Sequence, residues 1–525
     1  MEIHHSQFTK FSLFFISINF LSENMGFFTH WLNLYLGTIL LLCLLVSYFP
    51  FKPMIVAKRL LIAGLFFSLL GFALLPKDII LRLTGVIFVL FGFGLFLRGL
   101  NYQPKEIPTL LFATSLYLFF IIFYKFHPFV WCGLQNLSLS FTASLSTLIR
   151  KDILLGHTFL GLFISLLLLF IILSLCLFSQ KKKIFSLILS LVLVLFIQIV
   201  YVIGAAFLIE IFHKKDIFIL ILPTFLSLLL LIPLYFGLKD VEFQVEQTRG
   251  GKIFIPIIGL LVCFSIGFMT FPHPSQKSVS KEKVVFYEKG FLNWNIPTFN
   301  DFGAYSGGMF GNLPLFVARI GFEPIWTKTI TQKILNEAKI LVMINIEEAI
   351  ADDENKAIWE FVEKGGSLLL LGDHTFYKKG ASNQLNDILE PVNIKYNFDS
   401  ADYFIGGWLH SYQYLNHPIT IGLEDIEDEP GIVVGASLKI THPAYPIIMG
   451  KYGYSDPGKE DNPEQAYLGN LDYDPNEQLG DIILVACQNY GQGKVLVFGD
   501  TSSFVNSLLV FSHDFVNRVF SWLAE

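Results

Sequence analysis

The sequence predicts an α-helical transmembrane bundle over residues 1–271, a linker over residues 272–282 and an α/β domain over residues 283–525. The amino-acid composition differs between the first and the second half of the chain. The chain is 53% hydrophobic and 15% charged, whereas soluble proteins carry about 25% charged residues. The charges concentrate in the second half, where short apolar runs alternate with helix-like segments. Such alternation is typical of a parallel sheet with helices on both faces.

Membrane-length apolar segments follow one another through the first half. A helix that crosses about 30 Å of hydrocarbon needs roughly 20 apolar residues. Residues 10–22 are predicted to form a short first helix, and residues 128–149, which alternate apolar with polar side chains, to form an interfacial or re-entrant helix. The other predicted spans cover residues 31–49, 60–76, 80–98, 107–125, 155–179, 184–211, 216–237 and 253–271.

Basic residues in short loops predict the orientation, because lysine and arginine favour the cytoplasmic side. With this orientation, the last predicted span, residues 253–271, leads from the cytoplasmic side to the outer side of the membrane. We therefore expect a multi-pass protein of the cytoplasmic membrane, with the lipid bilayer as a partner and the C-terminal domain extracytoplasmic. The loops on the cytoplasmic side carry Lys52, Lys58, Arg59, Arg98, Lys105, Lys181, Lys182, Lys183, Arg249 and Lys252, while Lys214 and Lys215 oppose this assignment.

Charge and cysteine content narrow the function classes. The net charge is −6, which gives no basic surface for nucleic acid. Cys487 is the lone cysteine of the predicted α/β domain, so no disulfide forms within that domain. Its place in an apolar run predicts a buried strand residue.

The α/β domain is predicted element by element. Continuous apolar runs indicate buried parallel strands, and Gly, Thr and Asp at segment ends mark helix boundaries. Asp352 or Asp353 is expected to cap the third helix. Strands are expected at 283–287, 323–326, 340–344 and 367–371, and helices at 313–320, 331–337 and 354–364.

The end of the chain follows another pattern. Strands at 481–487 and 494–499 are predicted to form a hairpin at the edge of the sheet. A final helix at 513–523 follows, capped by Ser512. Residues 391–480 are too long for a structureless connection and are predicted to form an inserted subdomain.

Two segments carry a resemblance to a known family. The segments GGSLLLLGDHT (365–375) and GQGKVLVFGDTSSF (491–504), followed by a closing amphipathic helix, resemble class I glutamine-amidotransferase-like domains of bacterial membrane proteins. The resemblance covers residues 282–525 and implies a flavodoxin-like sheet. True amidotransferases place a cysteine nucleophile on the turn that matches Gly372-Asp373-His374 here. The resemblance therefore implies a domain without glutaminase activity.

The membrane half resembles the exosortase family of membrane transpeptidases. The similarity lies in the order of Gly156–Gly161, a long span, three lysines at 181–183 and another long span. That family uses an intramembrane Cys, Arg and His. The span at 184–211 has no Arg, and Cys176 lies late in its helix, so the resemblance implies a lost catalytic apparatus.

Polar residues that follow the predicted strands are the candidate catalytic groups, because ligands bind outside the carboxyl ends of strands in open α/β sheets. Asp373 and His374 offer a general base or a pair of metal ligands. Asp500 follows a later strand, and His410 comes from the insertion. The alternative is that each Asp caps a turn and His374 is merely exposed.

The candidate ligand-binding residues lie in a glycine-rich segment and in the insertion. Glycines allow close backbone approach, a following helix N-terminus favours an anion, and aromatic rings stack on a sugar. The alternatives are a plain turn and a small core. These candidates are Asp301, Gly303, Tyr305, Gly307, Gly308 and Trp408.

The sequence does not identify a metal or a cofactor. His410 and His417 join Asp373 and His374 in a metal-site hypothesis that no HExxH or CxxC motif supports. The leading functional hypothesis is a module that binds an envelope glycan or a partner protein. The alternatives are an Asp/His hydrolase or transferase on an envelope substrate and an auxiliary subunit of a transporter.

Overall fold

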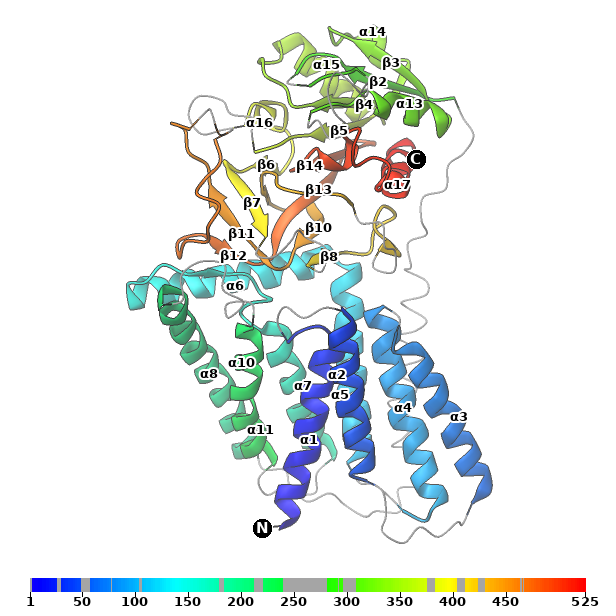
Figure 1. The fold of residues 1–525 in the computed structure, drawn as a ribbon, viewed down its shortest axis with the longest axis vertical. Coiled ribbons are helices and arrows are strands. Elements are labelled where there is room, and N and C mark those ends of the chain that lie inside the picture. Colours follow the sequence, from blue (N-terminus) through cyan, green and yellow to red (C-terminus); the bar gives the residue numbers. More distant parts are fainter. Residues whose placement is uncertain are drawn as a thin grey trace. The chain divides into compact units, whose positions relative to one another are not determined.

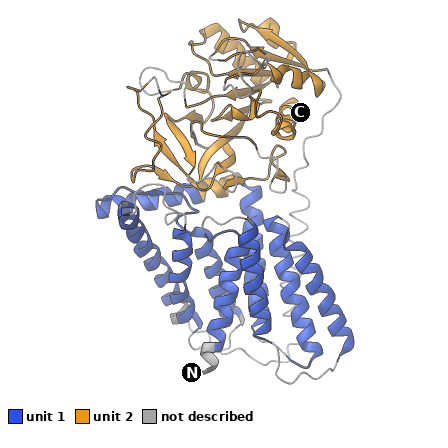
Figure 2. Cartoon of the chain, viewed as in Figure 1, with its two compact units in different colours: residues 1–127, 134–271 blue, residues 128–133, 272–525 orange. Residues whose placement is uncertain are grey.

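The protein divides into two compact units, which are described separately. One comprises residues 1–127 and 134–271, and the other residues 128–133 and 272–525 (Figure 2). The computed structural model describes residues 2–25, 30–48, 57–76, 78–102, 106–178, 184–211, 221–238, 281–290, 292–295, 308–374, 383–403, 411–423, 430–462, 465 and 467–525.

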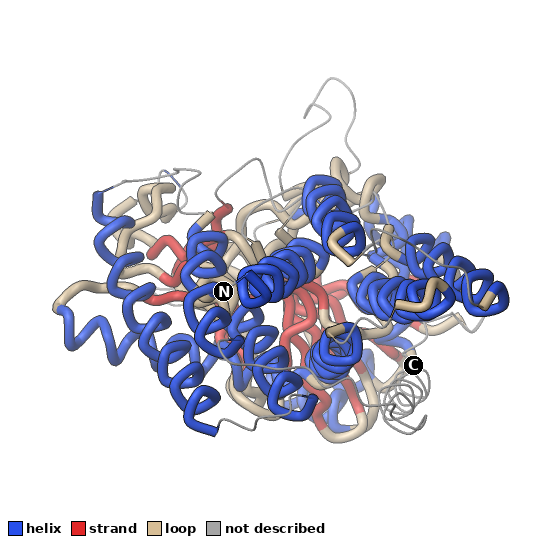
Figure 3. The backbone as a smooth tube through the Cα atoms, turned by 90° about the horizontal axis from the view of Figure 1, so that it is seen from below, coloured by secondary structure: helices blue, strands red, loops and turns tan. Residues whose placement is uncertain are grey.

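The first unit is built from apolar helices that lie side by side (Figure 3). Within the described ranges, three stretches are long and apolar enough to cross a membrane: α4, α5 and Ile188–Ile209 of α8. The helices are α1 (Glu2–Leu21), α2 (His30–Val46), α3 (Lys58–Leu74), α4 (Ile79–Gly99), α5 (Ile107–Phe126), α6 (Pro128–Ile149), α7 (Leu162–Phe178), α8 (Ile184–Ile211), α10 (Leu222–Leu229) and α11 (Leu231–Leu238), with a short strand β1 (Leu154–Leu155).

These three helices support membrane association, while the full set of predicted spans stays a prediction. The span expected at 155–179 is shorter than predicted, because α7 begins only at Leu162. In place of the span at 216–237, the described part contains α10 and α11, which are shorter apolar helices. The span expected at 253–271 lies outside the described residues.

The second unit is organised by an eight-stranded mixed sheet of order β3-β2-β4-β5-β14-β13-β10-β8 (Figure 1). The strands from β3 to β14 are parallel, and the β14–β13, β13–β10 and β10–β8 pairs are antiparallel. The strands are β2 (Lys283–Tyr287), β3 (Glu323–Thr327), β4 (Ala338–Ile344), β5 (Ser367–Leu371), β8 (Tyr412–Tyr414), β10 (Tyr445–Gly450), β13 (Ile482–Tyr490) and β14 (Gly493–Phe498).

Helices cover both faces of this sheet, which explains its continuous apolar strands. Alternate strand residues face opposite sides: Val284 and Phe286 pack in the core with α13 and α17, whereas Val285 and Tyr287 pack with α14, α15 and α16. The helices are α13 (Asn312–Arg319), α14 (Gln332–Leu335), α15 (Asp352–Glu363), α16 (Leu385–Ile388) and α17 (His513–Ala524).

The hairpin of β13 and β14 corrects a prediction, because it lies inside the sheet and not at its edge. The inserted region supplies β10 and β8, which extend the sheet beyond β13. A local turn pattern predicts a hairpin, but it says nothing about strands that join from elsewhere. The rest of the insertion forms the pair β6 (Ile394–Tyr396) and β9 (Leu438–Ile440) and the strands β7 (Asp399–Tyr403), β11 (Gly453–Pro457) and β12 (Gln478–Leu479), of which β11 pairs with both others.

Two predicted caps differ in detail. The N-cap of α15 is Ala351, while Asp352 and Asp353 occupy its first turn, where acidic side chains favour the helix dipole. Ser512 is the N-cap residue of α17, but its hydroxyl donates to the carbonyl of Ser503 (2.6 Å) and accepts no hydrogen bond from the helix amides.

Glycine is required where β14 begins, so Gly493→Ala is predicted to destabilise the second unit by about 1–3 kcal/mol. A Cβ at this position would collide with the carbonyl oxygens of Gly366 and Val362, which are backbone atoms and yield little. Chemical denaturation of the full chain in detergent measures the change. Gly204→Ala in α8 is the control, because nothing lies within 4 Å of its added Cβ; equal stability of both variants would contradict the prediction.

Candidate functional site

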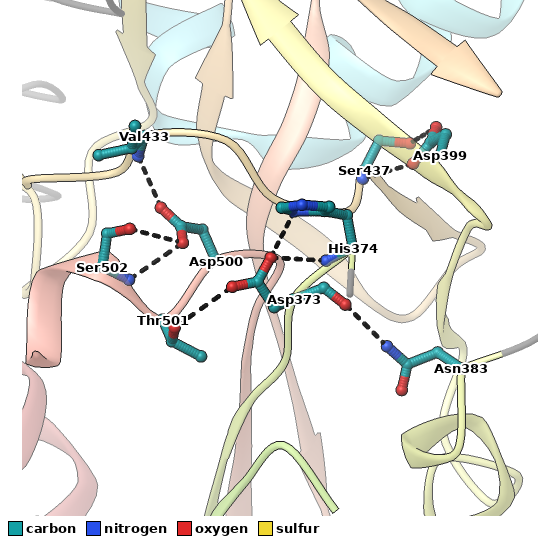
Figure 4. A network of polar contacts seen from close by, with 9 residues as sticks. All are labelled: Asp373, His374, Asn383, Asp399, Val433, Ser437, Asp500, Thr501 and Ser502. Carbon is teal, nitrogen blue, oxygen red and sulfur yellow. Dashed lines mark hydrogen bonds and ion pairs between the residues drawn. The ribbon is translucent and has the colours of Figure 1, made fainter. Parts of the chain in front are cut away.

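The candidate site begins where β5 and β14 end side by side. Leu371 and Phe498, the last residues of the two parallel strands, are register partners. The amide of Gly372 donates to the carbonyl of Phe498 (3.1 Å), which carries the pairing one residue further. Asp373 and Asp500 each follow the glycine after their strand, so the sheet brings the two carboxylates together (Figure 4).

Asp373 and His374 form a close pair. The Oδ1 atom of Asp373 lies 2.5 Å from Nδ1 of His374 and accepts the His374 amide at 2.7 Å. The hydroxyl of Thr501 donates to Oδ2 of Asp373 over a long 3.4 Å. Asn383 donates to the Asp373 carbonyl (3.3 Å). The carboxylate is thus oriented by its own turn and by the turn after β14.

Asp500 lies beneath this pair and is only 2% exposed. Its Oδ1 accepts the amide (3.0 Å) and the hydroxyl (2.8 Å) of Ser502, and its Oδ2 accepts the amide of Val433 (2.6 Å). Burial, followed by the negative charge of Asp373, raises the pKa of Asp500 to about 7 despite these bonds. Asp500 therefore caps its turn, as the structural alternative expected, and also couples electrostatically to the site.

Burial alone lowers the pKa of His374, but its neighbours more than offset that effect. The hydrogen bond and charge of Asp373, the charge of Asp500 and the carbonyl of Val434 leave the pKa of His374 raised above its ordinary value. The imidazole is therefore a cation held against carboxylates over a wider pH range than a free histidine.

Asp399 on β7, one of the polar residues that the insertion was expected to supply, is a buried carboxylate that interacts electrostatically with His374. Its Oδ1 accepts the Ser437 amide (2.8 Å), and its Oδ2 accepts the hydroxyls of Ser437 (2.5 Å) and Ser455 (2.6 Å). Burial raises the pKa of Asp399, while these hydrogen bonds and His374 lower it, with a net rise. Both of its oxygens already accept hydrogen bonds. Asp399 therefore affects the electrostatic potential at His374 but provides no free acceptor for a ligand.

One backbone segment, residues 430–437, connects all of these groups, and we call it the 430–437 strap. Its amides bind Asp500 and Asp399, its Val434 carbonyl acts on His374, and its Ala436 amide donates to the Gly499 carbonyl (2.8 Å). No motif in the sequence predicts this segment. The signal was Gly435, where a Cβ would collide with the Gly499 carbonyl and lie 2.6 Å from Cβ of Asp500.

The structure brings together three of the four predicted catalytic residues: Asp373, His374 and Asp500. Gly308 has a left-handed φ of 75° and precedes Met309, which forms an isolated β-bridge with Asn293. The structure around Gly308 is therefore consistent with the alternative of a plain turn. The remaining candidates lie outside the described residues: Asp301, Gly303, Tyr305, Gly307, Trp408 and His410.

His417 belongs to the core and not to the site. Its ring packs 4.6 Å from Trp522, and burial lowers its pKa to about 3, with Lys494 contributing. In the ranges that the structure describes, no group of three or more His, Cys, Asp or Glu side chains is arranged to hold a metal ion. Cys487 is a fully buried residue of β13, as predicted.

Comparisons with known proteins add little. No family model and no curated protein matches the chain. Among solved structures it is similar to the N-terminal domain of mmIFT52 (17% identity, 46% of this chain, 97% of that one, TM-score 0.32) and to a cytoplasmic protein from Salmonella typhimurium LT2 (13%, 46%, 100%, 0.31). A beta-galactosidase from Bacillus circulans sp. alkalophilus is similar over 36% of its length (12% identity, 52% of this chain, TM-score 0.22). None of the three is a glutamine amidotransferase, and such low TM-scores carry no argument.

The raised pKa of Asp500 predicts that the site loosens as pH rises. A carboxyl with a folded-state pKa near 7 and an ordinary value of 3.8 stabilises the fold in its protonated form, and this stability is lost as pH rises through the folded pKa. The raised pKa of His374 acts in the same direction. Hydrogen–deuterium exchange in the 430–437 strap, corrected for the intrinsic rate, should be about tenfold faster at about pH 8 than at about pH 5.

Asp500→Asn is the matched variant for this measurement, because it removes the titration and keeps an acceptor oxygen for Ser502. Its exchange should depend less on pH. An unchanged pH dependence would assign the effect to other groups such as Glu477, whose pKa burial raises to about 8.

Proposed function

We propose that the second unit is a ligand-binding module of a membrane protein and that it recognises an envelope glycan at the carboxyl ends of β5 and β14. One observation carries the proposal. The side chains of Asp373 and His374 remain 17% and 13% exposed, whereas the neighbouring residues Asp500 and Asp399 are buried, 2% and 5% exposed. An accessible polar pair supported by a fully bonded buried layer is the arrangement of a binding site.

The chemistry of the pair favours a ligand rich in hydroxyl groups. The carboxylate of Asp373 accepts hydrogen bonds and His374 donates them, so together they suit a sugar hydroxyl, which does both. Asp373 balances the imidazolium of His374, and the ionised fractions of Asp500 and Asp399, whose pKa values burial raises, add negative charge to the site. A neutral glycan is therefore expected to bind more tightly than a uronic acid oligomer, because its approach meets no charge repulsion.

Binding is favoured over covalent catalysis by the partners of the nearby hydroxyls. Thr501 and Ser502 donate to Asp373 and Asp500, and in the described part of the site no cysteine or serine hydrogen-bonds to His374. The strand order β3-β2-β4-β5-β14 corresponds to the 2-1-3-4-5 order of flavodoxin-like sheets. This order supports the resemblance to amidotransferase-like domains in which an Asp-His turn replaces the nucleophile.

Asp373→Ala and His374→Ala are each predicted to weaken glycan binding by at least about tenfold, the loss of one or two hydrogen bonds. The probe is the trisaccharide of N-acetylglucosamine, titrated calorimetrically into the full-length protein in nanodiscs. Asp461→Ala is the control, because this carboxylate is exposed and lies outside the cluster. Equal affinity of the two site variants and the control would remove the proposal.

We also propose that the first unit anchors the protein in the cytoplasmic membrane with the second unit on the outer side. The three apolar helices support membrane association, and the loop lysines and arginines support the orientation. The proposal predicts that Val510→Cys, at a position 68% exposed, reacts with a membrane-impermeant maleimide in intact cells. The wild-type chain, with its own cysteines, is the control; labelling only after lysis would reverse the orientation.

A second candidate function is acid–base chemistry on an envelope substrate. It rests on the 2.5 Å contact between Asp373 and His374, which holds a protonated imidazole in place as a general acid. Incubation of the wild-type protein with the same trisaccharide separates the two functions. Hydrolysis products that disappear in His374→Ala favour the enzyme, and binding without products favours the module.

A further inference from the structure

Asn345 occupies the carboxyl end of β4, one strand away from the Asp373–His374 pair. Ile344 and Leu371 are register partners at the ends of β4 and β5, and the Asn345 amide donates to the Leu371 carbonyl (2.9 Å). Asn345 therefore belongs to the same edge of the sheet as the candidate site, although no sequence motif marked it.

Two unfavourable features coincide at this residue. Its φ is +45°, in the left-handed region that residues other than glycine adopt infrequently, although asparagine adopts it more readily than most. It is only 4% exposed, and its Oδ1 atom has no hydrogen-bond donor among the described residues. A buried acceptor without a partner and a strained backbone each cost stability, and their combination is characteristic of functional sites.

The position of Asn345 in the sheet is equally distinctive. The chain order reverses between β2 and β4, which makes this edge a topological switch point, the usual place for a ligand in an open α/β sheet. Three residues beyond β2, Gly290 has a φ of +144°, and a Cβ there would collide with the carbonyl oxygens of Ile344 and Asn345. The two strand ends thus approach closely, and Asn345 supplies a polar side chain at their junction.

We propose that Asn345 is a ligand-binding residue whose Oδ1 accepts a hydrogen bond from a hydroxyl or N–H group of the same glycan that contacts Asp373. This inference rests on the proposed function and deepens it. The site then extends over the ends of β4, β5 and β14. Asp373 and Asn345 both offer acceptor oxygens, so the ligand class is a neutral oligosaccharide with several donors.

The role of Asn345 gives an unusual expected phenotype. Asn345→Gly removes the unpaired oxygen and relieves the left-handed strain, because glycine adopts positive φ freely. The variant should therefore melt at the same or a higher temperature than the wild type and yet bind the ligand at least about tenfold more weakly. A purely structural residue shows the opposite pattern.

The experiment uses the full-length protein in nanodiscs, with the N-acetylglucosamine trisaccharide and a galacturonic acid trisaccharide as probes, calorimetry for affinity and calorimetric scans for stability. Leu471→Gly is the control, since Leu471 also has a left-handed φ of 57° but lies in the loop before β12; it should leave affinity unchanged. Tighter binding of the neutral probe by the wild type, with the expected loss in Asn345→Gly, supports the inference.

The other outcomes separate the two proposals. Unchanged affinity in Asn345→Gly together with weakened binding in Asp373→Ala overturns the role of Asn345 and leaves the proposed function standing. A clearly lower melting temperature of Asn345→Gly overturns it too, because Asn345 would then serve the fold. Absence of binding of either probe to the wild-type protein overturns the glycan-binding function and this inference with it.

Discussion

The parallel pairing of β5 with β14 is the constraint on which the site depends. These strands are more than a hundred residues apart in the chain, and their register aligns Leu371 with Phe498. Because both strands continue into a glycine and then an aspartate, one alignment sets the positions of Asp373 and Asp500. A slip of one residue would send one of these carboxylates to the opposite face of the sheet. Helices bury both faces, so such a slip would also expose core side chains, and the fold thereby protects the geometry of the site.

Much of the local structure followed from the sequence, and the reasons are physical. Strands at 283–287 and 367–371 were predicted from apolar runs that are long enough to be buried and too short for helices, and the structure has them as β2 and β5. Because ligands bind at the carboxyl ends of strands in open α/β sheets, the sequence also predicts Asp373, His374 and Asp500 as candidate site residues. Contacts made by backbone groups far away in sequence could not be predicted in this way. The 430–437 strap contributes amides and a carbonyl, which any residue type provides. Gly435 is its one residue whose type is required by the close approach of the strap to Gly499.

The same limit explains why the position of the hairpin was predicted wrongly and why the hydrogen-bond partners of Asp399 could not be predicted. Turn residues specify that β13 and β14 pair, but the partners on the other side of β13 come from the insertion through register that no local pattern encodes. Asp399 lies within a short strand of that insertion, among residues whose composition indicates loops. Its carboxylate is held in place by hydrogen bonds from Ser437 and Ser455, which belong to two other segments and come together only in the folded protein.

The buried carboxylates and Asn345 show two ways in which polar groups persist inside this unit. Asp399 and Asp500 have their oxygens occupied by donors, and burial raises their pKa so that protonation limits the remaining cost. Asn345 has neither remedy, since an amide does not titrate and no donor reaches its Oδ1 from the described residues. A neutral group that stays unpaired while the buried carboxylates of Asp399 and Asp500 are fully bonded is more readily explained by an external donor than by the needs of the fold. Where the network of internal hydrogen bonds stops at this edge of the sheet, a ligand is the physically sufficient way to complete it.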